Sequence, residues 1–107
     1  MTLEDIAKIK CYQSRAIAEI MQRDEQTALF IIACYQDYLR GNYGVICEED
    51  KQANDKELAE GYGHILARNE ARFALPNDIY IETHFDKDMP LDEIDYNNTL
   101  IMLTEER

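Results

Sequence analysis

Residues 79–85 have the sequence Ile-Tyr-Ile-Glu-Thr-His-Phe, and this stretch decides the fold class. Isoleucine, threonine and phenylalanine occupy the odd positions, while Tyr80, Glu82 and His84 occupy the even ones. This period of two is typical of a β-strand with one buried face. A Pro-Asn-Asp turn at 76–78 precedes it. The sequence therefore predicts a strand over 79–85, the clearest element of the chain.

Two further stretches predict strands on either side of this one. Residues 64–74 alternate apolar odd positions with mostly charged even positions. Residues 99–103, Thr-Leu-Ile-Met-Leu, are apolar on both faces, as in a central or doubly covered strand. Residues 86–98 between the last two strands form an acidic, proline-containing loop. We therefore expect a small antiparallel sheet of about three strands.

The first part of the chain has helical spacing instead. Apolar residues over 3–22 predict an amphipathic helix, which Thr2 and Asp5 can begin with a capping box. The polar residues 23–26 predict a break. Residues 27–40 then predict a helix that is apolar nearly all round, as expected of a helix buried in a core or in an oligomer interface.

A third helix is predicted over residues 48–60, with acidic residues in its first turn and Gly61 at its end. The expected architecture is α+β, with about three N-terminal helices packed on one face of the sheet. The chain of 107 residues forms a single domain in this interpretation. Residues 1–60 are mainly helical, and residues 61–107 are mainly β.

Charge is distributed unevenly along the chain. The formal net charge is −11, and residues 46–107 contribute −10 of it. Direct binding to nucleic acid is disfavoured, because a phosphate backbone requires clustered lysine and arginine. A basic protein surface is the partner that this charge favours.

Several other classes of protein are excluded. No apolar run of about 18 residues is present, so the sequence predicts no membrane-spanning helix. Acidic residues occupy the N-terminal region where a signal peptide needs positive charge, which favours a cytoplasmic location. Cys11, Cys34 and Cys47 form no disulfide framework and are interpreted as buried small apolar side chains. No glycine-rich phosphate loop occurs, so no cofactor and no catalytic residue is assigned.

The acidic residues of 48–60 and 86–95 are the candidate partner-binding residues. Carboxylates at this density resemble the spacing of phosphates along a nucleic acid. They would then occupy a basic groove of a nucleic-acid-binding protein. Tyrosine is enriched at interface hot spots, so three tyrosines complete the set. The predicted residues are Glu48, Glu49, Asp50, Asp55, Glu57, Glu60, Asp86, Asp88, Asp92, Glu93, Asp95, Tyr43, Tyr62 and Tyr96.

Two alternatives stay open at this point. The apolar helix over 27–40 could build a homodimer, which would make the chain a structural or interaction protein without mimicry. Glu82, His84 and Asp86 alternate along one strand and could project to one face, where three such ligands can hold a divalent metal. The second alternative would make the chain a small metal-dependent enzyme.

The last two thirds of the chain, from residue 38 onward, resemble a family of small uncharacterised proteins encoded on bacterial plasmids, phages and integrated elements. The resembling segments are 38–44, 49–51, 54–55, 63–67, 79–81, 98–103 and 105–106. The resemblance implies a mobile-element setting, where small acidic proteins include inhibitors of host restriction and CRISPR nucleases. It adds an expected partner, a nucleic-acid-binding nuclease complex of the host, and transfers no catalytic residue.

Overall fold

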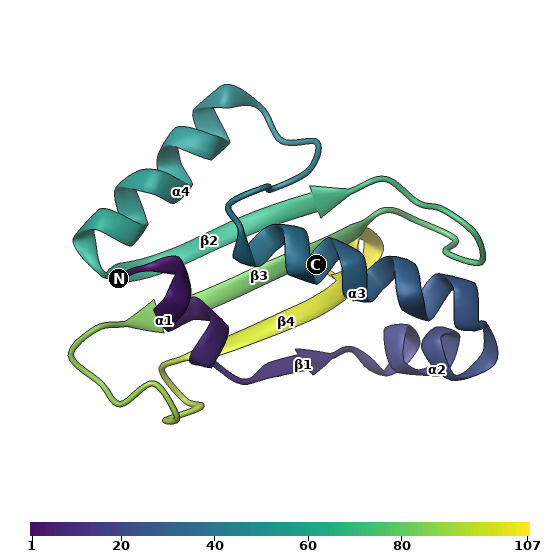
Figure 1. Ribbon diagram of the computed structural model, residues 1–107, viewed down its shortest axis with the longest axis horizontal. Coiled ribbons are helices and arrows are strands. Elements are labelled where there is room, and N and C mark those ends of the chain that lie inside the picture. Colours follow the sequence, from purple (N-terminus) through teal and green to yellow (C-terminus); the bar gives the residue numbers. More distant parts are fainter.

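A four-stranded mixed sheet organises the structure, a computed structural model that describes all 107 residues (Figure 1). The strand order is β1-β4-β3-β2. β3 runs antiparallel to both β2 and β4, whereas β1 runs parallel to β4. The strands are β1 (Cys11–Gln13), β2 (Tyr62–Asn69), β3 (Ile79–Asp86) and β4 (Asn98–Leu103). The α+β class is confirmed. The sheet was predicted to have three antiparallel strands, but it has a fourth, the edge strand β1, which runs parallel to its neighbour.

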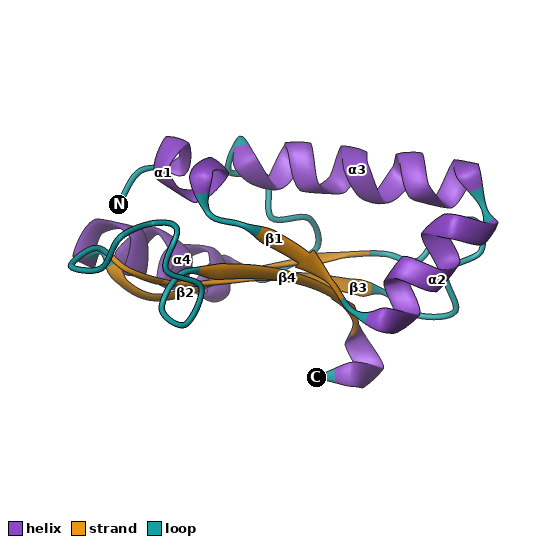
Figure 2. Ribbon diagram, turned by 90° about the horizontal axis from the view of Figure 1, so that it is seen from below, coloured by secondary structure: helices purple, strands orange, loops and turns teal.

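Four α-helices accompany the sheet. They are α1 (Leu3–Lys8), α2 (Arg15–Arg23), α3 (Glu25–Leu39) and α4 (Glu48–Glu60), and a short 3-10 helix η1 (Thr104–Glu106) follows β4. Figure 2 shows α1 and α3 on one side of the sheet and α2 at one end of it, next to α3. In contrast, α4 packs along β2 at the edge of the sheet. The prediction that the helices form a single layer over one face is therefore wrong for α4. None of the helices combines the length and apolar character needed to cross a bilayer.

The hydrophobic core lies between the sheet and the layer of α1, α2 and α3. Odd-numbered residues of β3 and β4 point into it, and the same alternation buries Ile65 and Ala67 of β2. Buried side chains of α1, α2 and α3, spaced one helical turn apart, pack against these strand residues. The fully buried apolar side chains include Ile6, Ile17, Ile31, Tyr38, Ile65, Ile79 and Ile81.

The predicted helix over 3–22 is instead three elements. The Thr2–Asp5 capping box begins α1 as expected, but the chain leaves the helix at Ile9 and becomes extended in β1. Ser14 then accepts a hydrogen bond from the amide of Ile17 and begins α2. Pairing with β4 satisfies the backbone of β1, an interaction with residues far along the chain that helical periodicity does not reveal.

The break between the next two helices is confirmed, and it is sharp. Asp24 ends α2 and begins α3, where its carboxylate accepts a hydrogen bond from the amide of Thr27 at 3.0 Å. At the other end of α3, Gly41 has φ +84°, the left-handed conformation that glycine adopts without strain.

The predicted strand over 64–74 is shorter than expected, because β2 ends at Asn69. Asp78 holds the turn that follows it. Its carboxylate accepts hydrogen bonds from the amide of Ala71 at 2.8 Å and from the Arg68 guanidinium at 2.9–3.0 Å. These two interactions, the amide first, hold the pKa of Asp78 below its usual value.

A chain of hydroxyl groups crosses the core. The Tyr38 hydroxyl lies 2.7 Å from Thr83 Oγ1 and donates to the carbonyl of Ile65, and Thr83 Oγ1 lies 2.8 Å from Thr99 Oγ1. All three side chains are fully buried. Burial raises the pKa of Tyr38 far above its ordinary value, so the hydroxyl stays neutral.

We expect Tyr38→Phe to lower the free energy of unfolding by about 1–2 kcal/mol, because it removes the buried hydrogen bonds of the Tyr38 hydroxyl to Thr83 and to the carbonyl of Ile65. Urea denaturation measures this change. Tyr12→Phe, at a half-exposed tyrosine of β1, is the matched control and should change stability by less than about 0.5 kcal/mol. Equal stability of the two variants would contradict a structural role for the hydroxyl chain.

Candidate binding surface on the open face of the sheet

The face of the sheet turned away from α1, α2 and α3 has no helical layer over it (Figure 2). Even-numbered residues of β2, β3 and β4 point to this open face, because side chains alternate along a strand. Two hollows lie on it, and they share His64. The first runs between α4 and the sheet, and the second lies at the end of the sheet where β2 begins.

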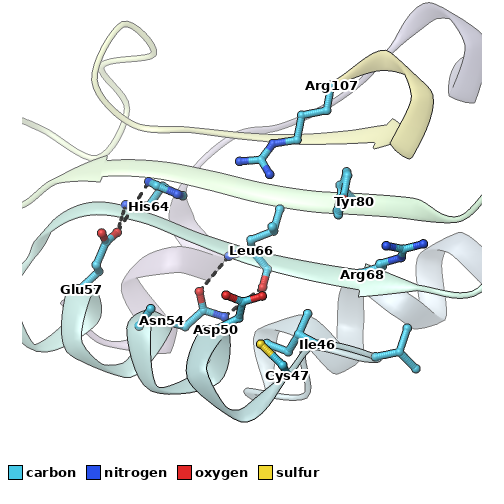
Figure 3. Close-up of a pocket in the computed structure, with 12 residues that line it drawn as sticks. Ile46, Cys47, Asp50, Asn54, Glu57, His64, Leu66, Arg68, Tyr80 and Arg107 are labelled. Atoms are coloured by element: carbon cyan, nitrogen blue, oxygen red, sulfur yellow. Dashed lines mark hydrogen bonds and ion pairs between the residues drawn. The ribbon is translucent and has the colours of Figure 1, made fainter.

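The first hollow is a groove of about 400 Å³ (Figure 3). Residues 45–47 and the facing side of α4 form one wall. Outward-pointing side chains of β2 and β3 form the other wall, and Arg107 lies at its rim. The groove therefore mixes acidic side chains from α4 with basic side chains from the sheet.

Hydrogen bonds from α4 hold the first wall in place. The Asn54 side chain accepts from the amide of Leu66 at 3.0 Å and donates to its carbonyl at 2.9 Å. One turn further, Glu57 accepts from the backbone amide of His64, and its carboxylate lies 3.7 Å from Nδ1 of that histidine (Figure 3). Since Asn54 is the one buried residue of α4, polar contacts position this helix more than apolar packing does.

A backbone bridge continues the same edge beyond α4. The amide of Arg68 donates to the carbonyl of Tyr43, and the amide of Val45 donates to the carbonyl of Arg68 at 2.7 Å. Gly44 makes this approach possible, because a Cβ there would collide with the Arg68 carbonyl. Its φ of +73° also favours glycine.

The floor of the open face contains a buried carboxylate with two partners. Glu82 is 8% exposed, and it accepts from Arg107 at 2.7 Å while its other oxygen lies 2.9 Å from Nε2 of His84. The guanidinium groups of Arg68 and Arg107 lie 5.9 and 5.3 Å from the centre of the Tyr80 ring. These arginines are therefore occupied by partners within the protein.

The second hollow, of about 440 Å³, lies at the end of the sheet where β2 begins, β3 ends and the acidic loop returns to β4. Its lining includes Tyr62, Tyr96, Asp86 and Asp95 together with the two histidines of the chain, which face each other across β2 and β3. The histidine ring centres lie 5.5 Å apart.

The structure separates thirteen of the fourteen predicted partner-binding residues into three groups, and the fourteenth, Tyr43, is buried. Six of them line the two hollows: Asp50, Glu57, Tyr62, Asp86, Asp95 and Tyr96. Four more are exposed along α4: Glu48, Glu49, Asp55 and Glu60. The remaining acidic residues are exposed in the loop after β3: Asp88, Asp92 and Glu93.

Tyr43 is a correction to the predicted set. Its side chain is only 5% exposed and packs edge-to-face on Tyr38, with ring centres 5.9 Å apart. It therefore belongs to the core and offers no surface to a partner. Cys47 is a correction of the opposite kind, since it was expected to be buried but is exposed in the groove, before the first turn of α4.

The metal-binding interpretation of Glu82, His84 and Asp86 does not fit the arrangement of these side chains. Arg107 and His84 take the carboxylate oxygens of Glu82, and Asp86 accepts a hydrogen bond from the amide of Asp88. No three His, Cys, Asp or Glu side chains come close enough together to hold a metal ion.

Asn54, Arg68, Tyr80 and Arg107 are site residues that the sequence did not indicate. Asn54 is one polar residue in a polar helix, and its burial becomes visible only when α4 lies against β2. The charged even positions in 64–74 were a usable signal for Arg68, because they place it on the outer face of its strand.

We expect Asn54→Ala to lower the free energy of unfolding by about 1–3 kcal/mol, because the amide and carbonyl of Leu66 both lose their partner. Hydrogen exchange should accelerate most along α4 and β2. Gln52→Ala, which truncates an exposed amide on the same helix, is the matched control and should behave as the parent protein. Unchanged exchange in α4 after Asn54→Ala would contradict the role given to this side chain.

The open face thus brings acidic, aromatic and imidazole groups together over two neighbouring hollows. Comparisons with models of known protein families, with curated proteins and with solved structures give no match for this chain.

Proposed function

We propose that this chain is a non-enzymatic binding protein that acts stoichiometrically in the cytoplasm. Its acidic surface consists of α4 and the loop 86–98, and it engages the basic nucleic-acid groove of a host nuclease complex. One observation supports this proposal above all: most carboxylates of these two segments are exposed and have no basic partner within the protein.

The ion pairs of the structure lie mostly elsewhere. Of the eleven acidic residues assigned to the surface, only Glu57 and Glu60 have a basic group within 4.0 Å. Their partners are His64 and the exposed Lys56, and an exposed pair of this kind contributes little stability. The remaining carboxylates repel one another in the free protein, and a basic partner would relieve that repulsion.

The charge density of α4 also fits a phosphate mimic. Six carboxylates occupy its 13 residues. At about 1.5 Å of rise per residue, this is one negative charge in roughly 3 Å of helix axis, close to the phosphate spacing of about 3.4 Å along one DNA strand. Lys51 and Lys56 lie between these carboxylates, so six acidic and two basic residues give α4 a net charge of −4.

The two acidic segments adjoin each other in space. The amide of Lys87, at the start of the loop, donates to the carbonyl of Gly61, at the end of α4, at 2.8 Å. Figure 1 shows the loop at the end of the sheet where α4 ends. A partner can therefore contact them together. The resemblance of residues 38–106 to proteins of mobile elements supports a host defence complex as that partner.

A second candidate function rests on the outer side of α3. Leu29 and Ile32, three residues apart on this helix, are 60% and 45% exposed there and form a small apolar patch. The alternative is a homodimer that buries this side of α3, in a structural or interaction role without mimicry.

The proposed mimicry of nucleic acid is tested by displacement of labelled duplex DNA from purified restriction enzymes and CRISPR effector complexes, followed by fluorescence anisotropy. We expect displacement to weaken as salt rises, because screening removes the attraction between exposed charges. Glu49→Lys with Asp55→Lys should weaken it by roughly tenfold or more, since electrostatic steering changes association rates by about 10–10³-fold.

Glu25→Lys with Glu70→Lys is the matched control, with the same change in charge at exposed sites outside the two acidic segments. It should displace DNA almost as well as the parent protein. Displacement that neither salt nor the α4 reversal weakens would exclude the mimic, provided that circular dichroism shows a folded variant.

The dimer alternative makes a separate prediction. If α3 forms the interface, Leu29→Glu with Ile32→Glu should convert a dimer to a monomer, because it places two charges in an apolar contact. Sedimentation equilibrium measures the mass before and after the change. A parent protein that is already a monomer at high concentration would exclude the dimer and would not affect the proposed mimicry of nucleic acid.

A further inference from the structure

The hollow at the end of the sheet has a chemistry of its own. It lies where Tyr62 begins β2, Asp86 ends β3, and Asp95 and Tyr96 end the acidic loop. Tyr62 is paired directly with Asp86 in the sheet, so one aromatic and one carboxylate are fixed on rigid strands. Phe85, which is 2% exposed, also lines the hollow.

Its two tyrosines are free to accept a partner. Tyr62 is 68% exposed and Tyr96 is 50% exposed. The protein stacks five of its own cation–aromatic pairs elsewhere, on Tyr12, Phe30, Phe73 and Tyr80, and none of them uses Tyr62 or Tyr96. Two amphipathic rings at the mouth of one hollow are well suited to a cationic group, which is attracted to the face of an aromatic ring.

Charge complementarity points to the same kind of occupant. Asp86 and Asp95 line the hollow without any ion pair, and no lysine or arginine lines it. The Lys87 side chain lies against Gly61 instead. Both histidines already have carboxylate neighbours, Glu57 for His64 and Glu82 for His84. The Asp95 carboxylate is therefore left for a charge supplied from outside. So is one oxygen of Asp86, whose other oxygen accepts from the amide of Asp88.

We propose that this hollow binds an arginine side chain of the protein partner, and this rests on the proposed function, since it specifies how the acidic surface recognises a basic one. A planar guanidinium can stack on a tyrosine ring while its N–H groups donate to a carboxylate. The carboxylates of α4 then supply long-range attraction, and the hollow supplies a short-range contact with defined geometry.

The test uses two capped tripeptides, Gly-Arg-Gly and Gly-citrulline-Gly, which differ in the charge of the side chain. In a titration followed by amide NMR, the arginine peptide should shift the signals of residues 62–64 and 95–96 in a saturable way. The citrulline peptide should bind at least roughly fivefold more weakly, because it lacks the cation. Equal binding of the two peptides would overturn the proposal.

Variants locate the site. Tyr96→Ala and Asp95→Asn should each weaken the arginine peptide by roughly fivefold, whereas Tyr96→Phe, which keeps the ring, should retain most of the binding. Tyr12→Ala and Asp37→Asn are the matched controls, at exposed positions outside the hollow and outside the two acidic segments, and should bind as the parent protein does. Binding that Tyr96→Ala and Asp95→Asn leave unchanged would place the peptide elsewhere and refute the assignment.

The outcome separates this proposal from the proposed function. If the chain displaces DNA from a nuclease complex but binds the arginine and citrulline peptides equally, the proposed mimicry is supported and the proposed arginine site is wrong. If the arginine peptide binds in the hollow but no nuclease complex releases its DNA, the arginine site stands and the nuclease partner is wrong.

Discussion

The side chain of Asn54 occupies the place where a neighbouring strand would otherwise pair with β2. An edge strand with open amides and carbonyls invites pairing with other chains, and proteins close such edges in various ways. Here Asn54 satisfies both backbone groups of Leu66, Glu57 accepts from the next outward amide, and the backbone at Tyr43 and Val45 pairs with Arg68. The same contacts that close the edge determine where α4 lies. The groove, its acidic wall and the access to the open face all depend on them.

This arrangement separates the part of the molecule that gives stability from the part that carries charge. Isoleucines from α1, α2, α3 and the sheet fill the core on one side of the sheet. The acidic helix contributes little to that core, since its one buried side chain is polar and only Leu58 packs against the core cluster. Its carboxylates therefore face solvent at a cost in mutual repulsion that the core on the opposite side must offset. Such a division allows the charged surface to change in evolution without loss of the fold.

Local patterns in the sequence predicted much of this structure. The strand over 79–85, the break within 23–26 and the acidic helix over 48–60 with Gly61 at its end were all predicted, because each is marked by a pattern within a few residues. The strand Cys11–Gln13 could not be predicted in this way, because it exists only through pairing with a segment nearly ninety residues later in the chain. The candidate site was predicted only in part, because some of its features are local and others depend on tertiary contacts. Charge density indicated α4 and the loop, whereas the burial of Tyr43 and the role of Asn54 arise from tertiary contacts.

The parallel pairing of β1 with β4 has a consequence for the order of events during synthesis. β4 lies between β1 and β3 in the sheet, yet it follows both of them in the chain. When the ribosome has released everything up to β3, the first strand still has no neighbour in the sheet. Within the sheet, only the hairpin of β2 and β3 can form early, together with α4, because these contacts are local. The acidic surface can therefore take shape before the core that supports the rest of the molecule closes.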